Sequence, residues 1–134
     1  AIRYDPADGP SKRDLATLLA DDPRRIERAF ALALEARALL PNDPDLAVLL
    51  GTVHLEREEY LEAIRYLEQA EIHLEGDVRR QVHYLLGRSY VANGQIALGR
   101  ETLKRALAGV GARQSPPPWA ERARETLARL ETVR

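Results

Sequence analysis

The feature that most constrains this chain is an internal repeat with an offset of 36 residues. The triplet Leu49-Leu50-Gly51 recurs as Leu85-Leu86-Gly87. The same offset carries His54 onto Tyr90, Tyr60 onto Ile96, Ala63 onto Gly99, Leu67 onto Leu103 and Ala70 onto Ala106. A backward offset of 34 places Tyr60, Ala63, Leu67 and Ala70 over Ile26, Ala29, Ala33 and Ala36. Repeats of this length are typical of arrays in which each unit buries its apolar face against its neighbours.

The periodicity inside the repeat is helical. Apolar residues recur at spacings of three and four, as in Ile26, Ala29, Phe30 and Ala33. Leu and Ala dominate the composition, and both lose little conformational freedom in a helix. No stretch alternates with period two over enough residues to predict a strand. We therefore expect an all-α protein with helices near 11–20, 24–40, 44–57, 59–74, 78–93, 95–109 and 117–132.

Capping residues mark the expected helix ends. Asp22-Pro23, Asp43-Pro44 and Ser115-Pro116 each place a side-chain acceptor before a proline, which is typical of a helix start. We also expect Ser11 and Asp77 to cap helices, and Asn93-Gly94 to end one. Residues 1–10 are interpreted as an extended tail, and 109–118 as a linker.

Small and large residues alternate at the repeated positions. The small residues Gly51, Ala63, Gly87 and Gly99 let the two helices of a hairpin approach closely. The large residues Leu50, Tyr60, Leu67, Leu86, Tyr90 and Leu103 fill the space between hairpins.

These residues resemble the tetratricopeptide repeat family. In the middle unit the matching residues are Leu50, Gly51, Tyr60, Ala63, Leu67 and Ala70, and in the next they are Leu86, Gly87, Tyr90, Gly94, Gly99, Leu103 and Ala106. The first unit matches only in its second helix, at Ala29, Ala36 and Pro41, and has Thr17 where a small residue is expected. The resemblance implies a right-handed α-solenoid within a single domain at 11–134, with repeats at 11–43, 44–79 and 80–115 and a capping helix at 116–132.

The resemblance also implies a concave groove lined by the first helix of each repeat. The residues that would face it are Val48, Thr52, Leu55, Gln81, Tyr84, Arg88, Val91 and Arg124, with Leu127 beside them. Tyr and Arg anchor protein interfaces well, so Tyr84 and Arg88 are the central candidates. We expect a peptide or partner protein as the occupant. The alternative is that these side chains are solvated or covered by the tail.

One known occupant of such grooves is disfavoured by the residues here. Some family members hold acidic chaperone tails with Lys, Arg and Asn. Thr52 and Arg88 stand where Asn would be needed, and no Lys lies in the two groove helices.

Catalytic and metal chemistry have little support in the sequence. His54 and His83 occupy positions that the repeat gives to large packing residues, and a metal held by His73, His83 and Glu71 or Glu75 is a weaker alternative. Ser11, Ser89 and Ser115 lie in no nucleophile motif. Glu58 and Glu59 are interpreted as a solvated acidic edge. We therefore expect neither an enzyme nor a cofactor.

Nucleic acid is a rival partner, because related helical repeats bind single-stranded RNA. Arg24, Arg25, Arg28 and Arg37 share one expected helix, and Arg122, Arg124 and Arg129 share another. Acidic residues are interleaved with them, and the net charge is −1. We therefore expect salt-bridged outer faces and no nucleic-acid partner.

The ends of the repeat array leave a third possibility. An incomplete terminal repeat exposes apolar surface, which favours self-association or continuation into a longer protein. The chain begins at Ala1 and contains no Met, which suggests processing or a fragment. No apolar run approaches a membrane span, so we expect no membrane insertion and a soluble location on the cytoplasmic or periplasmic side of a bacterium.

Overall fold

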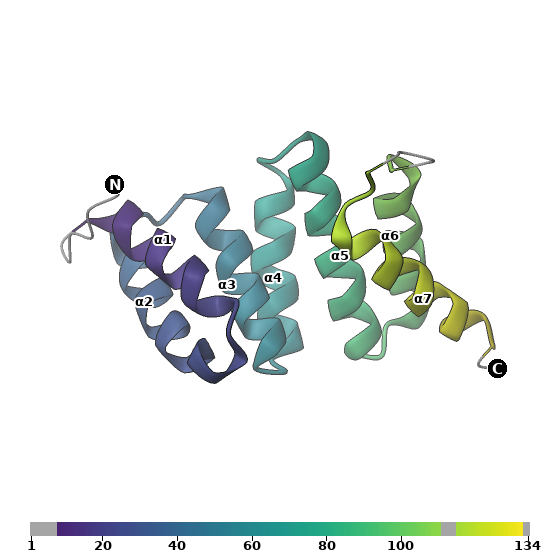
Figure 1. Ribbon diagram of the computed structural model, residues 1–134, viewed down its shortest axis with the longest axis horizontal. Coiled ribbons are helices and arrows are strands. Elements are labelled where there is room, and N and C mark those ends of the chain that lie inside the picture. Colours follow the sequence, from purple (N-terminus) through teal and green to yellow (C-terminus); the bar gives the residue numbers. More distant parts are fainter. Residues whose placement is uncertain (1–7, 111–114, 133–134) are drawn as a thin grey trace. The chain divides into compact units, whose positions relative to one another are not determined.

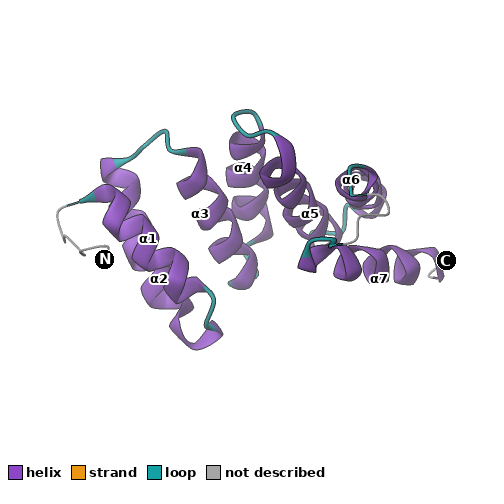
Figure 2. Ribbon diagram, turned by 45° about the horizontal axis from the view of Figure 1, so that its top comes forward, coloured by secondary structure: helices purple, strands orange, loops and turns teal. Residues whose placement is uncertain are grey.

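The computed structural model describes residues 8–110 and 115–132. Over these ranges the chain is all-helical and contains no strand, as Figures 1 and 2 show. The elements are α1 (Gly9–Ala20), the 3₁₀ turn η1 (Pro23–Arg25), α2 (Ile26–Leu39), α3 (Pro44–Glu56), α4 (Tyr60–Glu71), α5 (Gly76–Ala92), α6 (Ile96–Ala108) and α7 (Pro118–Thr132). The all-α prediction and the seven expected helices are confirmed for the described residues, with ends that differ by a few residues.

The chain forms two compact units, residues 1–70 and residues 71–134. We call them the N-terminal unit and the C-terminal unit and describe each by itself. The N-terminal unit contains α1, α2, α3 and α4 up to Ala70. The C-terminal unit contains α5, α6 and α7, and α6 and α7 both pack against α5.

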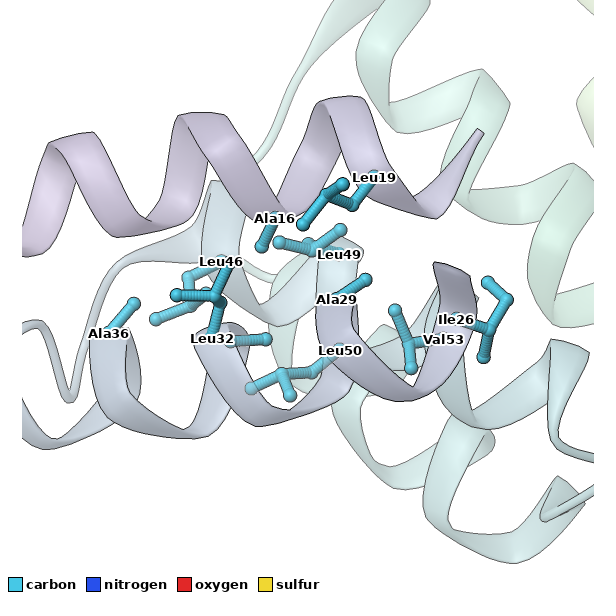
Figure 3. Close-up of a cluster of buried hydrophobic side chains, with 11 residues drawn as sticks. Ala16, Leu19, Ile26, Ala29, Leu32, Ala36, Leu46, Leu49, Leu50 and Val53 are labelled. Atoms are coloured by element: carbon cyan, nitrogen blue, oxygen red, sulfur yellow. The ribbon is translucent and has the colours of Figure 1, made fainter. Parts of the chain in front are cut away.

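The core of the N-terminal unit lies among α1, α2 and α3 (Figure 3). Alanines such as Ala16 and Ala29 have no exposed surface, and the larger Leu46, Leu50 and Val53 are equally buried. Small residues on one helix therefore face large residues on the next, which brings the helix axes close while filling the space between them.

Each unit contains the same glycine–leucine contact. A Cβ added to Gly51 of α3 would lie 2.6 Å from Cγ of Leu67 in α4. In the C-terminal unit, a Cβ on Gly87 of α5 would lie 2.6 Å from Cδ2 of Leu103 in α6. The prediction that these glycines allow close helix approach is confirmed, and the two contacts are related by the 36-residue offset.

The ends of α3 and α5 also match across this offset. The amide of Gln95 donates to the carbonyl of Tyr90 at 2.8 Å, and the amide of Glu59 donates to that of His54 at 2.9 Å. In both cases the amide bonds to the carbonyl five residues earlier, and the residue before the donating amide is left-handed. This arrangement is a Schellman motif. Gly94 takes that place after α5 with φ +87°, whereas Glu58 takes it after α3 with φ +62°. The predicted Asn93-Gly94 helix end is confirmed.

The predicted helix starts are only partly correct. Asp43 caps α3, because its carboxylate accepts from the amides of Asp45 and Leu46 at 2.9 and 3.4 Å. Asp22 accepts from the amide of Arg24 at 3.0 Å, although it caps η1 rather than α2.

Three other predicted caps are wrong. Ser11 lies inside α1, where its hydroxyl donates to Asp8, the residue at the N-cap position. Asp77 lies inside α5, one residue after Gly76. Ser115 precedes α7 by three residues, because the helix starts at Pro118. In each case the backbone becomes helical at a different residue from the one that the polar side chain suggested.

The prediction of an extended tail over residues 1–10 is wrong for its last two residues. Gly9 and Pro10 belong to α1, and a Cβ on Gly9 would lie 2.8 Å from Cγ of Leu40. Residues 1–7 lie outside the described residues. Thr17 is exposed, so the small buried residue at this point of α1 is its neighbour Ala16. Of the expected linker, Val110 is buried, and residues 111–114 lie outside the described residues.

Candidate binding surfaces

Helix α5 carries four of the predicted groove residues, and they differ in accessibility. Gln81 is exposed, Arg88 and Val91 are half-buried, and Tyr84 is 5% exposed. Val91 packs against Gly99 of α6. If Gly99 carried a Cβ, that atom would lie only 2.5 Å from Cγ2 of Val91. The surface that α5 offers is therefore centred on Gln81 and Arg88.

A stack of three side chains holds Arg88 in place. The ring of Tyr84 is stacked on Trp119 of α7, with centroids 5.4 Å apart and planes 19° apart. The guanidinium carbon of Arg88 lies 5.6 Å from the centroid of the Tyr84 ring. Tyr84 and Trp119 are both buried, so they act as a rigid support, and the cation–π contact orients the partly accessible arginine.

The remaining groove candidates are placed as follows. Arg124 is exposed on α7 and lies 3.9 Å from Glu121, one turn earlier, and Leu127 is half-buried. In the N-terminal unit, Val48 and Thr52 are half-buried, and the Thr52 hydroxyl donates to the Val48 carbonyl at 2.9 Å. Leu55 is buried, so its side chain is not available at the surface of α3.

A pocket in the N-terminal unit was missed by the sequence analysis. It has a volume of about 320 Å³ and is lined by Phe30, Leu34, Arg37, His54, Glu62, Arg65, Tyr66 and Gln69. The buried ring of His54 lies between Phe30 and Tyr66, with centroids 5.2 and 5.4 Å away. The signal that could have revealed the pocket is the 36-residue offset that relates Phe30 to Tyr66.

One side of this aromatic cluster is fixed by Glu59. Its carboxylate accepts from Nε of Arg57 at 2.6 Å and lies 3.1 Å from Nδ1 of His54. These two hydrogen bonds lower the pKa of Glu59, and the one from Arg57 has the larger effect. Arg57 also lies over the Phe30 ring, 4.0 Å from its centroid. Glu59 is thus part of a network although its side chain is 38% exposed, and Glu58 beside it is exposed, so the interpretation as an acidic edge in contact with solvent is confirmed.

The packing role predicted for His54 and His83 is confirmed, because both are buried. His73 is exposed. The carboxylate nearest His83 Nε2 is Glu71, at 3.5 Å. Among residues 8–110 and 115–132, no group of three or more His, Cys, Asp or Glu side chains could hold a metal ion.

The serine hydroxyls of α1 and α5 are occupied by helix contacts. Ser11 donates to Asp8, and the buried Ser89 donates to the carbonyl of Leu85 at 2.8 Å. Each has a local acceptor on its own helix or at its start, so neither hydroxyl is paired with a histidine base in the described part of the chain.

The ion pairs follow a different pattern from the predicted one. Glu27 pairs with Arg57 at 2.5 Å and Glu35 with Lys12 at 3.3 Å, and both pairs join different segments. The acidic residues interleaved with the arginines are Glu27, Glu35, Glu121, Glu125 and Glu131. Of these, only Glu121 has a described partner on its own helix, Arg124. Arg37 lies over the Tyr66 ring instead, 5.5 Å from its centroid.

None of the described helices is both long and apolar enough to cross a membrane. In comparisons with known proteins, no protein-family model and no curated protein matches the chain.

Proposed function

We propose that this chain is a non-catalytic protein-interaction module built from tetratricopeptide-like hairpins, and that it binds a peptide or partner protein. The repeat is supported by two independent matches at an offset of 36 residues. Gly51 and Gly87 meet a leucine in the same way, and α3 and α5 end in the same motif. A stacked, right-handed solenoid is the arrangement that such hairpins favour.

The observation that carries the binding proposal is the fixed position of Arg88. An arginine that is already ordered loses little side-chain entropy when a partner binds. Arg88 is half-buried over Tyr84, and the exposed Gln81 lies about two helical turns before it on the same helix. A peptide carboxylate at this surface would find a forked donor in Arg88, and a carbonyl further along the peptide would find the amide of Gln81. Val48 and Thr52 are the corresponding candidates of the N-terminal unit.

The experiment starts from a library of short random peptides displayed on phage and selected on the immobilised chain. An enriched peptide is then synthesised with a fluorescent label, and its affinity is measured by anisotropy. We expect Arg88→Ala to weaken binding by about tenfold or more, which is typical of an interface hot spot. Gln81→Ala should weaken it less, because the lost hydrogen bond is uncharged.

Arg122→Ala is the matched control. Arg122 is an exposed arginine of α7 in the same unit, and its removal changes the net charge equally. The control should bind the peptide like the unmodified chain. The proposal fails if no peptide is enriched, or if Arg88→Ala and Arg122→Ala bind the selected peptide equally well. Circular dichroism of both variants verifies that they remain helical.

A further inference from the structure

A basic pocket lies beside the N-terminus of α5 in the C-terminal unit. It has a volume of about 440 Å³ and is lined by Gly76, Arg79, Arg80, His83, Arg105 and Gly109. We call it the arginine pocket. Its volume falls within the range of roughly 300–1,000 Å³ that is usual for small-molecule sites.

Nearby carboxylates only partly balance the three arginines. Arg80 pairs with Asp77 at 2.6 Å, whereas Arg79 is 3.9 Å from Glu71. Arg105 makes no ion pair within residues 8–110 and 115–132. Arg80 is also held in place, because a Cβ on Gly109 would lie 1.8 Å from its Nε. The pocket therefore brings together three guanidinium groups, of which that of Arg80 packs against Gly109 and that of Arg79 is exposed.

His83 adds a polar atom that lacks a hydrogen bond. Its side chain is 9% exposed, and its Nε2 is buried without a hydrogen-bond partner. The carboxylate of Glu71 lies 3.5 Å from this atom, too far for a good hydrogen bond but close enough to pair with a protonated imidazole. A buried polar atom without a partner is costly, so an oxygen atom bound in the pocket would stabilise it.

The start of α5 lacks the side-chain cap that α3 has. Its N-cap residue, Glu75, makes no side-chain hydrogen bond to the first turn, whereas Asp43 caps α3. The helix dipole favours negative charge at this end, where Asp77 already lies in the first turn.

We propose that the arginine pocket binds the phosphate group of a phosphate monoester. A phosphate dianion offers three acceptor oxygens and two negative charges, which match several guanidinium groups at once. A carboxylate offers two acceptor oxygens and one negative charge, so it would balance less of the charge of the three arginines. The space beyond the phosphate accommodates part of the molecule that carries it. This site lies apart from Arg88 and is independent of the peptide-binding proposal.

The first test uses inorganic phosphate as the probe. The ¹⁵N-labelled chain is titrated with potassium phosphate at pH 7.5, and with potassium chloride of equal ionic strength. We expect saturable shifts of the backbone amides of residues 77–79 and of the His83 side-chain nitrogen, with a dissociation constant of about 1 mM or lower. Chloride should produce only small, linear shifts.

Variants assign the binding to the pocket. Arg105→Gln should weaken phosphate binding by about tenfold, because one charge-assisted contact is lost. Arg79→Gln should have a similar effect and provides a second measurement if the first variant folds poorly. Arg122→Gln removes the same charge from α7 and should bind phosphate normally. Linear shifts in the unmodified chain, or equal affinities in Arg105→Gln and Arg122→Gln, would overturn the proposal.

Two further probes distinguish the source of the phosphate. Glycerol 3-phosphate represents small phosphorylated metabolites, and a capped phosphoserine peptide represents a phosphorylated protein segment. Tighter binding of either probe supports the site and identifies its ligand class, whereas binding no stronger than that of chloride contradicts it. Arg88→Ala should retain phosphate affinity, so failure of the peptide-binding proposal would be recognised separately.

Discussion

Leu67 of α4 fills the space that Gly51 leaves on α3. The Leu67 side chain has no exposed surface, and it would lie 2.6 Å from any Cβ added at residue 51. Because the leucine is enclosed, it cannot move away from a larger residue without disturbing its neighbours. This contact shows how a single hydrogen atom in place of a methyl group sets the distance between two helices.

Gly51→Ala should destabilise the chain by about 1–2 kcal/mol. Overpacking against Leu67 costs about 1–3 kcal/mol, and the higher helix propensity of alanine offsets part of that cost. Urea unfolding followed by circular dichroism measures the change. The control is the same substitution in a Leu67→Ala background, where the added methyl group has room and should be harmless or stabilising. An equal loss in both backgrounds would show that Leu67 is not the cause.

Glu58→Gly should stabilise the chain by about 0.5–1 kcal/mol. Glu58 has φ +62°, and this left-handed conformation strains a residue that carries a Cβ. Glycine removes the strain, although it also gains freedom in the unfolded chain. The matched variant is Gly94→Ala at the equivalent end of α5, which should lose about 1 kcal/mol. If both substitutions shift the urea midpoint in the same direction, backbone strain does not govern these turns.

Glu59 should make stability depend on pH in the acidic range. Its folded-state pKa lies below the ordinary value because Arg57, and then His54, donate hydrogen bonds to the carboxylate. A lowered carboxyl pKa contributes stability above the unfolded-state value of about 4.5, and this contribution is lost as the pH falls through the folded-state value. Urea midpoints at pH 7 and pH 3.5 should therefore differ more in the unmodified chain than in Glu59→Gln.

Glu56→Gln serves as the control for this measurement. Glu56 is exposed near the end of α3, close in sequence to Glu59. Its variant should retain the full pH dependence of the unmodified chain. If the two glutamine variants respond to acid alike, the Arg57 and His54 contacts do not stabilise the charged form of Glu59.

His83 should make stability fall at mildly acidic pH. Burial lowers its pKa, with further lowering by Arg79 and Arg105, and Glu71 opposes the change only in part. The unfolded chain then binds a proton at a higher pH than the folded chain, so stability falls as the pH drops below about 6.5. Urea unfolding at pH 7.5 and 5.5 should show a smaller loss in His83→Gln than in the unmodified chain.

His73→Gln tests whether this effect belongs to His83. His73 is exposed and lies outside α4 and α5. Its substitution should leave the pH-dependent loss unchanged. If His73→Gln reduces the loss as much as His83→Gln does, the buried histidine is not the source.

The helices could be predicted from the sequence because local signals determine them. Pro44 and Gly94 mark a start and an end, and apolar spacing defines the helical faces between them. The capping residues were harder to predict. Helix α1 starts at Gly9, with Asp8 at its N-cap position and Pro10 in its first turn, so local signals also exist for the observed start. The capping-box pattern of Ser11 and Asp14 competes with them, and local rules do not decide between the two starts.

Only those features of the binding surfaces that depend on a single helix could be predicted from the sequence. Tyr84 and Arg88 are four residues apart on one helix, so their proximity follows from helix geometry. The support from Trp119 depends on how α7 folds back onto α5. The arginine pocket unites Arg79 and Arg80 of α5 with Arg105 of α6, and helix periodicity alone does not bring these residues together.

The stacking of Trp119 on Tyr84 has a practical consequence. Trp119 is the only tryptophan of the chain, and the residue is 9% exposed. Its fluorescence therefore reports on one event, the seating of α7 against α5. Detachment of α7 would move this ring into water and shift its emission to longer wavelength, so local opening of the C-terminal unit becomes visible without an added label.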